Sequence, residues 1–149
     1  MWKRILVPHD FSACANHAAA LARDEAKAHG GEILLLHVVD LPPAFGPNTP
    51  VLVGPGETPI GIRDYVMLGA TEHVADLASR LEQDGATVST FVRVGHVVEE
   101  ILRLAREHEV DSIVMGTHGR SGLRHLFAGS VAERVVRASS VPVVTTRHE

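Results

Sequence analysis

A run of small residues directly after an apolar segment carries the strongest chemical signal in this chain. The apolar residues Ile113-Val114-Met115 are followed by Gly116-Thr117-His118-Gly119-Arg120-Ser121-Gly122. Because a glycine has no side chain, the backbone N–H groups beside it can approach an anion closely. We therefore predict that this loop forms a cradle for phosphate groups.

A second candidate anion site begins a few residues later, at Gly129-Ser130. Ser130 and Glu133 have the spacing of a capping box, which predicts that the last helix starts here. The free N–H groups and the positive dipole end of a helix start attract anions. The loop and the helix start are thus expected to hold one polyphosphate between them. The alternative is ordinary turn chemistry after a strand, with Ser130 acting only as a cap.

Five segments predict the strands of the sheet that positions these loops. Four of them are rich in β-branched residues or leucine and are expected to be buried on both faces, namely 5–7, 33–39, 113–115 and 141–144. The fifth, 87–94, alternates in period two and is predicted to be an edge strand. Helical spacing predicts helices at 12–29, 66–81 and 98–105, besides the one from Ser130. Strands that alternate with helices make βαβ units, so we predict an open, mostly parallel α/β sheet with helices on both faces.

Residues 41–63 interrupt this alternation, because they contain six of the eight prolines and four glycines. We expect no regular element in this segment. It is long for a loop inside a compact domain, so it is either a mobile flap over a site or a surface excursion without a role.

Length, charge and cysteine content narrow the class of protein. A chain of 149 residues with 45% hydrophobic residues can bury one core, so residues 1–149 are expected to form a single domain. The net charge of -4, without a basic tract, argues against nucleic acid as a partner. A lone cysteine, Cys14, excludes an intramolecular disulfide and favours a reducing, cytoplasmic location. The apolar run at 5–8 is too short for a signal peptide or a membrane span, so no membrane partner is expected.

The spacing of Gly116, two residues, Gly119, nine residues and Gly129-Ser130 resembles the nucleotide-binding signature of the universal stress protein family. The resemblance extends to further segments, which are Ile5-Leu6-Val7-Pro8 with Asp10 and Ser12, His37-Val38-Val39, Val94-Gly95 and Val141-Pro142-Val143. It implies a Rossmann-like, open parallel five-stranded sheet with the strand order 3-2-1-4-5. It also implies a role in the stress response.

The ATP-binding branch of that family supplies roles for particular positions. The residue matching Asp10 contacts the nucleoside end there, backbone near Val39 lines the adenine pocket, and Met115 would lie beside the base or ribose. The matching loop and serine bind the triphosphate. The site residues expected for ATP, with Mg²⁺ on its phosphates, are Pro8, His9, Asp10, Val39, Met115, Gly116, His118, Gly119, Arg120, Gly129, Ser130 and Val131. The resemblance also implies a homodimer through the last strand, residues 143–147, since an exposed edge favours such pairing.

Asp10 has three interpretations, which are binding of ribose hydroxyls, acceptance of a phosphoryl group and capping of the first helix. Binding and capping are favoured, because nothing else indicates a phosphoryl-transfer enzyme. The chain has no glycine-lysine pair of a Walker loop, and its only lysines are Lys3 and Lys27. Any ATP hydrolysis is therefore predicted to be slow.

Two other functions and a metal site remain as alternatives to a nucleotide-dependent regulatory module. The module would bind ATP in a cleft between the ends of the strands at 5–7 and 113–115. A slow ATPase or a nucleotidyl-transfer enzyme would use the same cleft, and a dimeric interaction protein would not need the nucleotide. Ten histidines allow a metal site at His118 with His125 or at His9 with His37. No pair has the spacing of a known zinc motif, so Mg²⁺ on the phosphates is favoured.

Overall fold

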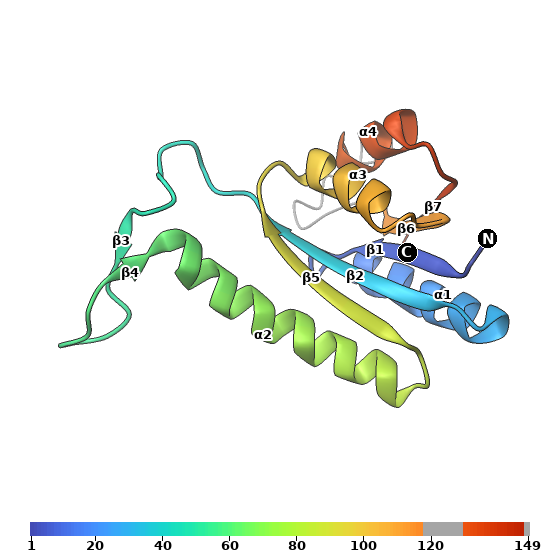
Figure 1. The fold of residues 1–149 in the computed structure, drawn as a ribbon, viewed down its shortest axis with the longest axis horizontal. Helices are drawn as coiled ribbons and strands as arrows, with labels where there is room; N and C mark the ends of the chain where they lie inside the picture. The colour runs from blue at the N-terminus through green and yellow to red at the C-terminus, as the bar shows by residue number, and fades with distance from the viewer. Residues whose placement is uncertain (118–129, 148–149) are drawn as a thin grey trace.

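A five-stranded parallel sheet forms the centre of the molecule (Figure 1). The computed structural model describes residues 1–117 and 130–147. The strands of the sheet are β1 (Arg4–Pro8), β2 (Glu32–Val39), β5 (Val88–Val94), β6 (Ser112–Gly116) and β7 (Val143–Thr146). Their order is β5-β2-β1-β6-β7, and every neighbouring pair is parallel. Counted along the chain these strands lie in the order 3-2-1-4-5, so the predicted Rossmann-like topology is confirmed.

Helices cover both faces of the sheet (Figure 1). They are α1 (Ala13–His29), α2 (Ile62–Gln83), α3 (Val97–Glu107) and α4 (Ser130–Ala138). α1 and α2 pack on one face, and α3 and α4 pack on the other. The predicted helices are confirmed, although α2 begins at Ile62, one turn before its periodic apolar run.

α1 carries a cap at each end and a narrow apolar face. The hydroxyl of Ser12 accepts a hydrogen bond from the N–H of Ala15 at 3.2 Å. At the other end, Gly30 adopts the left-handed conformation with φ 61° and donates its N–H to Ala26. The buried face consists almost wholly of alanines, so the helix axis lies close to the sheet.

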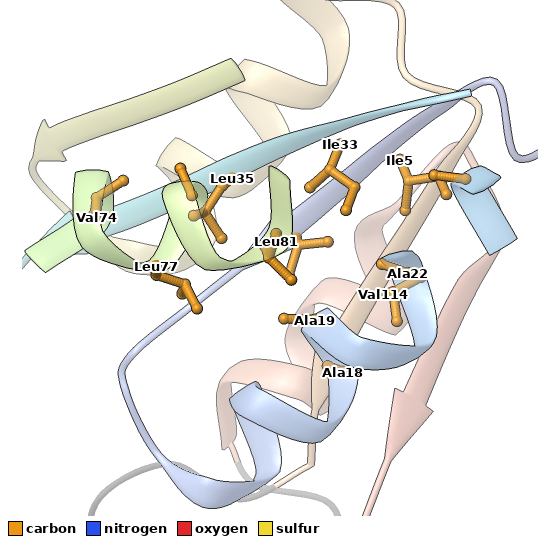
Figure 2. Packing of buried hydrophobic residues seen from close by; sticks show 13 residues of the cluster. Ile5, Ala18, Ala19, Ala22, Ile33, Leu35, Val74, Leu77, Leu81 and Val114 are labelled. Carbon is orange, nitrogen blue, oxygen red and sulfur yellow. The ribbon is translucent and has the colours of Figure 1, made fainter. Parts of the chain in front are cut away.

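Side-chain alternation along the strands divides the core into two clusters. The cluster under α1 and α2, drawn in Figure 2, includes Ile5, Val7, Ile33, Leu35 and Val114 from the sheet. The cluster under α3 and α4 includes Leu6, Leu34, Leu36, Ile113 and Met115. Each fully buried Leu or Ile contributes about 1.5–3 kcal/mol to folding. Alternate residues of the central strands are thus buried on opposite faces, as the continuous apolar runs predict.

The last strand differs from its prediction. It spans Val143–Thr146 rather than 141–144, although it lies beside β6 at an edge of the sheet, as the strand order 3-2-1-4-5 implies. Val143 and Val144 are half-buried and Thr145 is exposed, so burial on both faces was the wrong expectation for this segment. An edge strand has a neighbour on one side only, and apolar composition by itself does not reveal that.

The proline-rich segment also departs from its prediction, because it contains a short antiparallel pair. β3 (Pro50–Val51) pairs with β4 (Ile60–Gly61), and α2 follows directly. The N–H of Ile62 donates to the carbonyl of Thr49 at 2.7 Å, which ties the pair to the start of α2. Strands of two residues are too short to produce a periodic sequence pattern, so an irregular segment was predicted instead. Figure 1 shows that this part of the chain projects from the sheet.

Asp111 fastens the N-terminal residues to the start of β6. Its carboxylate accepts hydrogen bonds from the N–H groups of Trp2, Lys3 and Arg4 at 2.8–3.1 Å. Ser112 also donates its hydroxyl to this carboxylate.

Within the described residues, no helix is long and apolar enough to cross a membrane.

Candidate functional site

The two central strands stop pairing before they end. β1 and β6 are paired only at Ile5 with Ser112 and at Leu6 with Ile113, although the strands continue to Pro8 and Gly116. On its other side, β1 stays paired with β2 as far as Pro8. In open α/β sheets, ligands bind beyond the carboxyl ends of the strands, at the point where the connections diverge to opposite faces. That point lies between β1 and β6 here.

The turn from β1 to α1 is built around the buried ring of His9, which is 4% exposed. Its Nδ1 accepts the N–H of Phe11 at 3.0 Å, and Nε2 donates to Oδ1 of Asn16 at 3.1 Å. An N–H group can only donate, so the proton of the neutral ring must be on Nε2. Burial is the largest cause that lowers the pKa of His9 from 6.5 to about 4, against the opposing effect of Asp10. The ring is therefore neutral at physiological pH.

Asp10 follows His9 and is half-buried. Its Oδ1 accepts the N–H of Ser12 at 3.0 Å, while Ser12 itself is the N-cap of α1. The interpretation of Asp10 as the helix cap is therefore wrong, because Ser12 takes that position. Among the described residues, no hydrogen bond reaches Oδ2 of Asp10, so this oxygen can accept one from a ligand.

Phe11 has a backbone conformation that is unusual for a side chain of its size, with φ 63°. Its ring lies against three imidazoles, those of His37, His9 and His73, at centroid distances of 4.8, 5.2 and 5.7 Å. These rings come from the turn, from β2 and from α2, so the contact joins three parts of the chain. The sequence contained no periodic signal for this cluster, because its members are far apart in sequence.

The end of β2 presents backbone rather than side-chain groups. Val39 is half-buried, and its carbonyl accepts the N–H of Gly95 at 3.0 Å. This bond ties the end of β2 to the residue that follows β5. A carbonyl oxygen has a second lone pair, so Val39 can still accept one hydrogen bond from a ligand.

The end of β6 lies directly against the first turn of α1. A Cβ added to Gly116 would stand 2.7 Å from Cβ of Cys14, 2.9 Å from its carbonyl carbon and 3.0 Å from the nitrogen of Ala15. A glycine is required here because the helix packs so closely. Met115 is 4% exposed and packs in the cluster under α3 and α4.

Thr117 and Thr146 complete this corner of the sheet. Thr117 donates its N–H to the carbonyl of Thr146 at 2.9 Å, and its hydroxyl donates to the same oxygen at 3.1 Å. The hydroxyl of Thr146 donates to the carbonyl of Cys14 at 3.2 Å. The ends of β6 and β7 and the start of α1 therefore form one hydrogen-bonded unit.

The structure describes only part of the predicted set of site residues. Pro8 is buried at the end of β1, and Val131 is half-buried in the first turn of α4, which starts at Ser130 as predicted. Four of the predicted residues lie outside the described residues, namely His118, Gly119, Arg120 and Gly129. The same holds for the alternative pair His118 and His125.

The other alternative pair, His9 and His37, does come together, but not as metal ligands. Nδ1 of His37 donates to the backbone carbonyl of His9 at 2.7 Å, and both ring nitrogens of His9 already have partners. Across residues 1–117 and 130–147, no group of three His, Cys, Asp or Glu residues is arranged to hold a metal ion.

Comparison with known proteins gives one consistent family. The model of the universal stress protein family, Usp, matches residues 1–147 of the chain. The universal stress protein MJ0577 of Methanocaldococcus jannaschii is 30% identical over 161 aligned residues, which cover 100% of this chain and 97% of that protein. Its solved structure has a TM-score of 0.82 to this chain at 27% identity, covering 100% of this chain and 98% of that one.

Two other similar structures are described as nucleotide complexes. A universal stress protein from Archaeoglobus fulgidus in complex with dAMP has a TM-score of 0.69 at 22% identity, covering 97% of both chains. A universal stress protein in complex with cAMP has a TM-score of 0.66 at 21% identity, covering 97% of this chain and 96% of that one. At these identities the likeness is one of fold.

Proposed function

This chain belongs to the universal stress protein family, and we propose that it is a regulatory module of the stress response that binds ATP. The observation that carries the proposal is the end of pairing between β1 and β6, flanked by the Asp10 turn and by Gly116. The glycine signature continues from Gly116 towards the start of α4. A ligand at this point would meet the predicted loop on one side and the Asp10 carboxylate on the other.

The proposed contacts follow the polarity of the nucleotide. Oδ2 of Asp10 accepts hydrogen bonds from ribose hydroxyls, and backbone at Val39 contacts the adenine edge. The backbone N–H groups of the signature loop and of the start of α4 bind the phosphates. Magnesium is proposed to bind through phosphate oxygens and water, because the described residues offer no carboxylate cage for it.

Two observations support binding rather than rapid turnover. Similar folds occur in proteins described as complexes with dAMP and cAMP, so this architecture accommodates an adenine nucleotide. The imidazole beside Asp10 has both nitrogens engaged in hydrogen bonds, so it is not free to act as a general base. We propose that any ATP hydrolysis or nucleotidyl transfer is slow.

We also propose that the chain forms a homodimer through the edge of β7 that faces away from β6. The backbone N–H of Ile113 donates to the carbonyl of Pro142, and that of Thr117 donates to the carbonyl of Thr146. The backbone N–H and C=O groups of the even-numbered residues of β7 therefore face β6. The backbone groups of Val143 and Thr145 therefore face the open edge. Sedimentation should show a dimer for the wild type and a monomer for Thr145→Pro, which removes one outward N–H group. A Thr145→Pro protein that still dimerises would exclude this interface.

Calorimetry with ATP, ADP and AMP, followed by a single-turnover assay of the same samples, tests the nucleotide proposal. We expect measurable binding of ATP and negligible formation of ADP or AMP over the time of the binding measurement. Gly129→Val should weaken ATP affinity at least about tenfold, because a branched side chain would block the N–H groups of the cradle. Gly69→Val is the matched control, since no described heavy atom beyond its own turns of α2 lies within 4 Å of the Cβ position of Gly69. Equal ATP affinity in wild type and Gly129→Val would refute the phosphate assignment.

A further inference from the structure

His9 connects the β1–α1 turn to two other elements. Its N–H donates to the carbonyl of Leu36 at 2.8 Å, and its own carbonyl accepts Nδ1–H of His37 at 2.7 Å, so β2 holds both backbone groups. Its ring donates to Asn16 on α1. All four polar groups of this residue therefore have a partner within the protein, and neither ring nitrogen is left for a ligand.

The ring of His9 also supports the left-handed residue of the turn. Phe11 has φ 63°, a conformation that is unfavourable for a residue with a large side chain. Its N–H donates to Nδ1 of His9, and its ring packs against His37 and His73. Asp10 lies between His9 and Phe11, so the backbone on both sides of the carboxylate is held in place.

We infer that His9, held by His37, is a positioning residue that sets the carboxylate of Asp10 for the ribose hydroxyls of the bound nucleotide. The inference rests on the proposed function, and it moves His9 from the set of ligand contacts to the residues that support them. The ring acts through Phe11 and Asp10 and does not touch the nucleotide. His37 is added to the site as the second member of this support.

The charge state of the ring is part of this role. A protonated imidazole has an N–H on both nitrogens and cannot accept the N–H of Phe11. The groups that influence His9 are Asp10 and Asn16 on the turn and α1, His37 on β2 and Arg80 on α2. Burial outweighs the effect of Asp10, so the ring remains an acceptor at neutral pH.

The test compares three probes, ATP, 2′,3′-dideoxy-ATP and inorganic tripolyphosphate, by calorimetry on the full chain. The ratio of the affinities for ATP and dideoxy-ATP measures recognition of the ribose hydroxyls. His9→Leu fills much of the same volume but cannot accept a hydrogen bond, so it should reduce this ratio about tenfold towards one. Its affinity for tripolyphosphate should stay within about twofold of the wild type.

His9→Asn is the conservative variant that should restore the ratio. An asparagine side chain readily accepts the N–H two residues on, which is the bond that Phe11 makes to His9 here. A role limited to filling volume would not be rescued, because asparagine is smaller than leucine. His17→Asn is the matched control, since His17 is exposed on α1, next to Asn16.

The outcomes separate this inference from the proposed function. A wild type that binds neither ATP nor tripolyphosphate contradicts the proposed function itself. Two results with a wild type that binds ATP would overturn the positioning role alone. One is a ratio of ATP to dideoxy-ATP affinity that His9→Leu leaves unchanged, and the other is a ratio near one in the wild type itself. If His9→Leu does not fold, His37→Phe decides, because it removes the donor to the His9 carbonyl and keeps a ring beside Phe11. A wild-type ratio in that variant overturns the inference.

Discussion

Gly116→Ala should destabilise the fold, because the added methyl group has no room between β6 and α1. Its Cβ would lie 2.7 Å from Cβ of Cys14 and within 3.0 Å of backbone atoms of Cys14 and Ala15. An ordinary contact needs about 3.4–4 Å, and the atoms that must move belong to a helix start rather than to a flexible side chain. Overpacking of this kind costs about 1–3 kcal/mol, and the backbone contact favours the upper part of that range.

Thermal and urea unfolding measure this effect. A loss of about 2–3 kcal/mol should lower the Tm by about 5–10 °C for a domain of this size. The matched control is Gly69→Ala, because Gly69 is exposed and an added Cβ there meets no described heavy atom within 4 Å beyond its own turns of α2. That change should stabilise the helix by about 0.5–1 kcal/mol. A Gly116→Ala protein within about 0.5 kcal/mol of the wild type would refute the packing argument, and Gly116 would then be required only for the ligand.

Three further predictions concern pH and helix capping. Burial lowers the pKa of His9 to about 4, so between about pH 6.5 and pH 4 the His9 ring is protonated only in the unfolded chain, and the stability of the wild type falls as the pH drops through this window. In urea unfolding, His9→Asn should lose about 2–3 kcal/mol less stability than the wild type over the same window. Burial raises the pKa of Asp111, but the donors on Lys3, Ser112, Arg4 and Trp2 outweigh it and hold the pKa below its usual range. The contribution of Asp111 is thus present above the unfolded pKa and is lost as the pH falls through the folded one, so Asp111→Asn should cost about 1 kcal/mol at neutral pH and less near pH 2 in the same assay. Ser12→Ala should cost about 1 kcal/mol in thermal unfolding, while Ser12→Asp, which keeps a capping oxygen, should cost little.

The sequence predicted the central sheet well because buried strands have a compositional signal. The continuous apolar runs at 5–7, 33–39 and 113–115 lie within β1, β2 and β6, and the alternating run at 87–94 is the edge strand β5. The run at 141–144 has the same composition but follows the last helix, and its position at the edge depends on which neighbours exist. That information is a property of the whole topology and not of the segment.

The candidate site was predicted less completely, because residue types do not specify which atoms are already in use. His9 was expected among the ligand contacts, yet both its ring nitrogens are bonded to Phe11 and Asn16. Gly116 was expected to serve a phosphate, and the structure adds a packing reason that involves Cys14, far away in the sequence. Contacts of this kind depend on tertiary distances, which periodicity and spacing do not contain.

The short pairing between β1 and β6 has a consequence for the response of the whole domain to a ligand. Two residue pairs join β1 to β6, whereas five join β1 to β2. The boundary between β1 and β6 is therefore the weaker of the two seams beside β1. A molecule bound across it adds connections where the sheet has few of its own. Binding there would slow amide hydrogen exchange on both sides of this boundary and would raise the apparent melting temperature with ligand concentration, so occupancy is readable from the exchange rates of strands that the ligand does not touch.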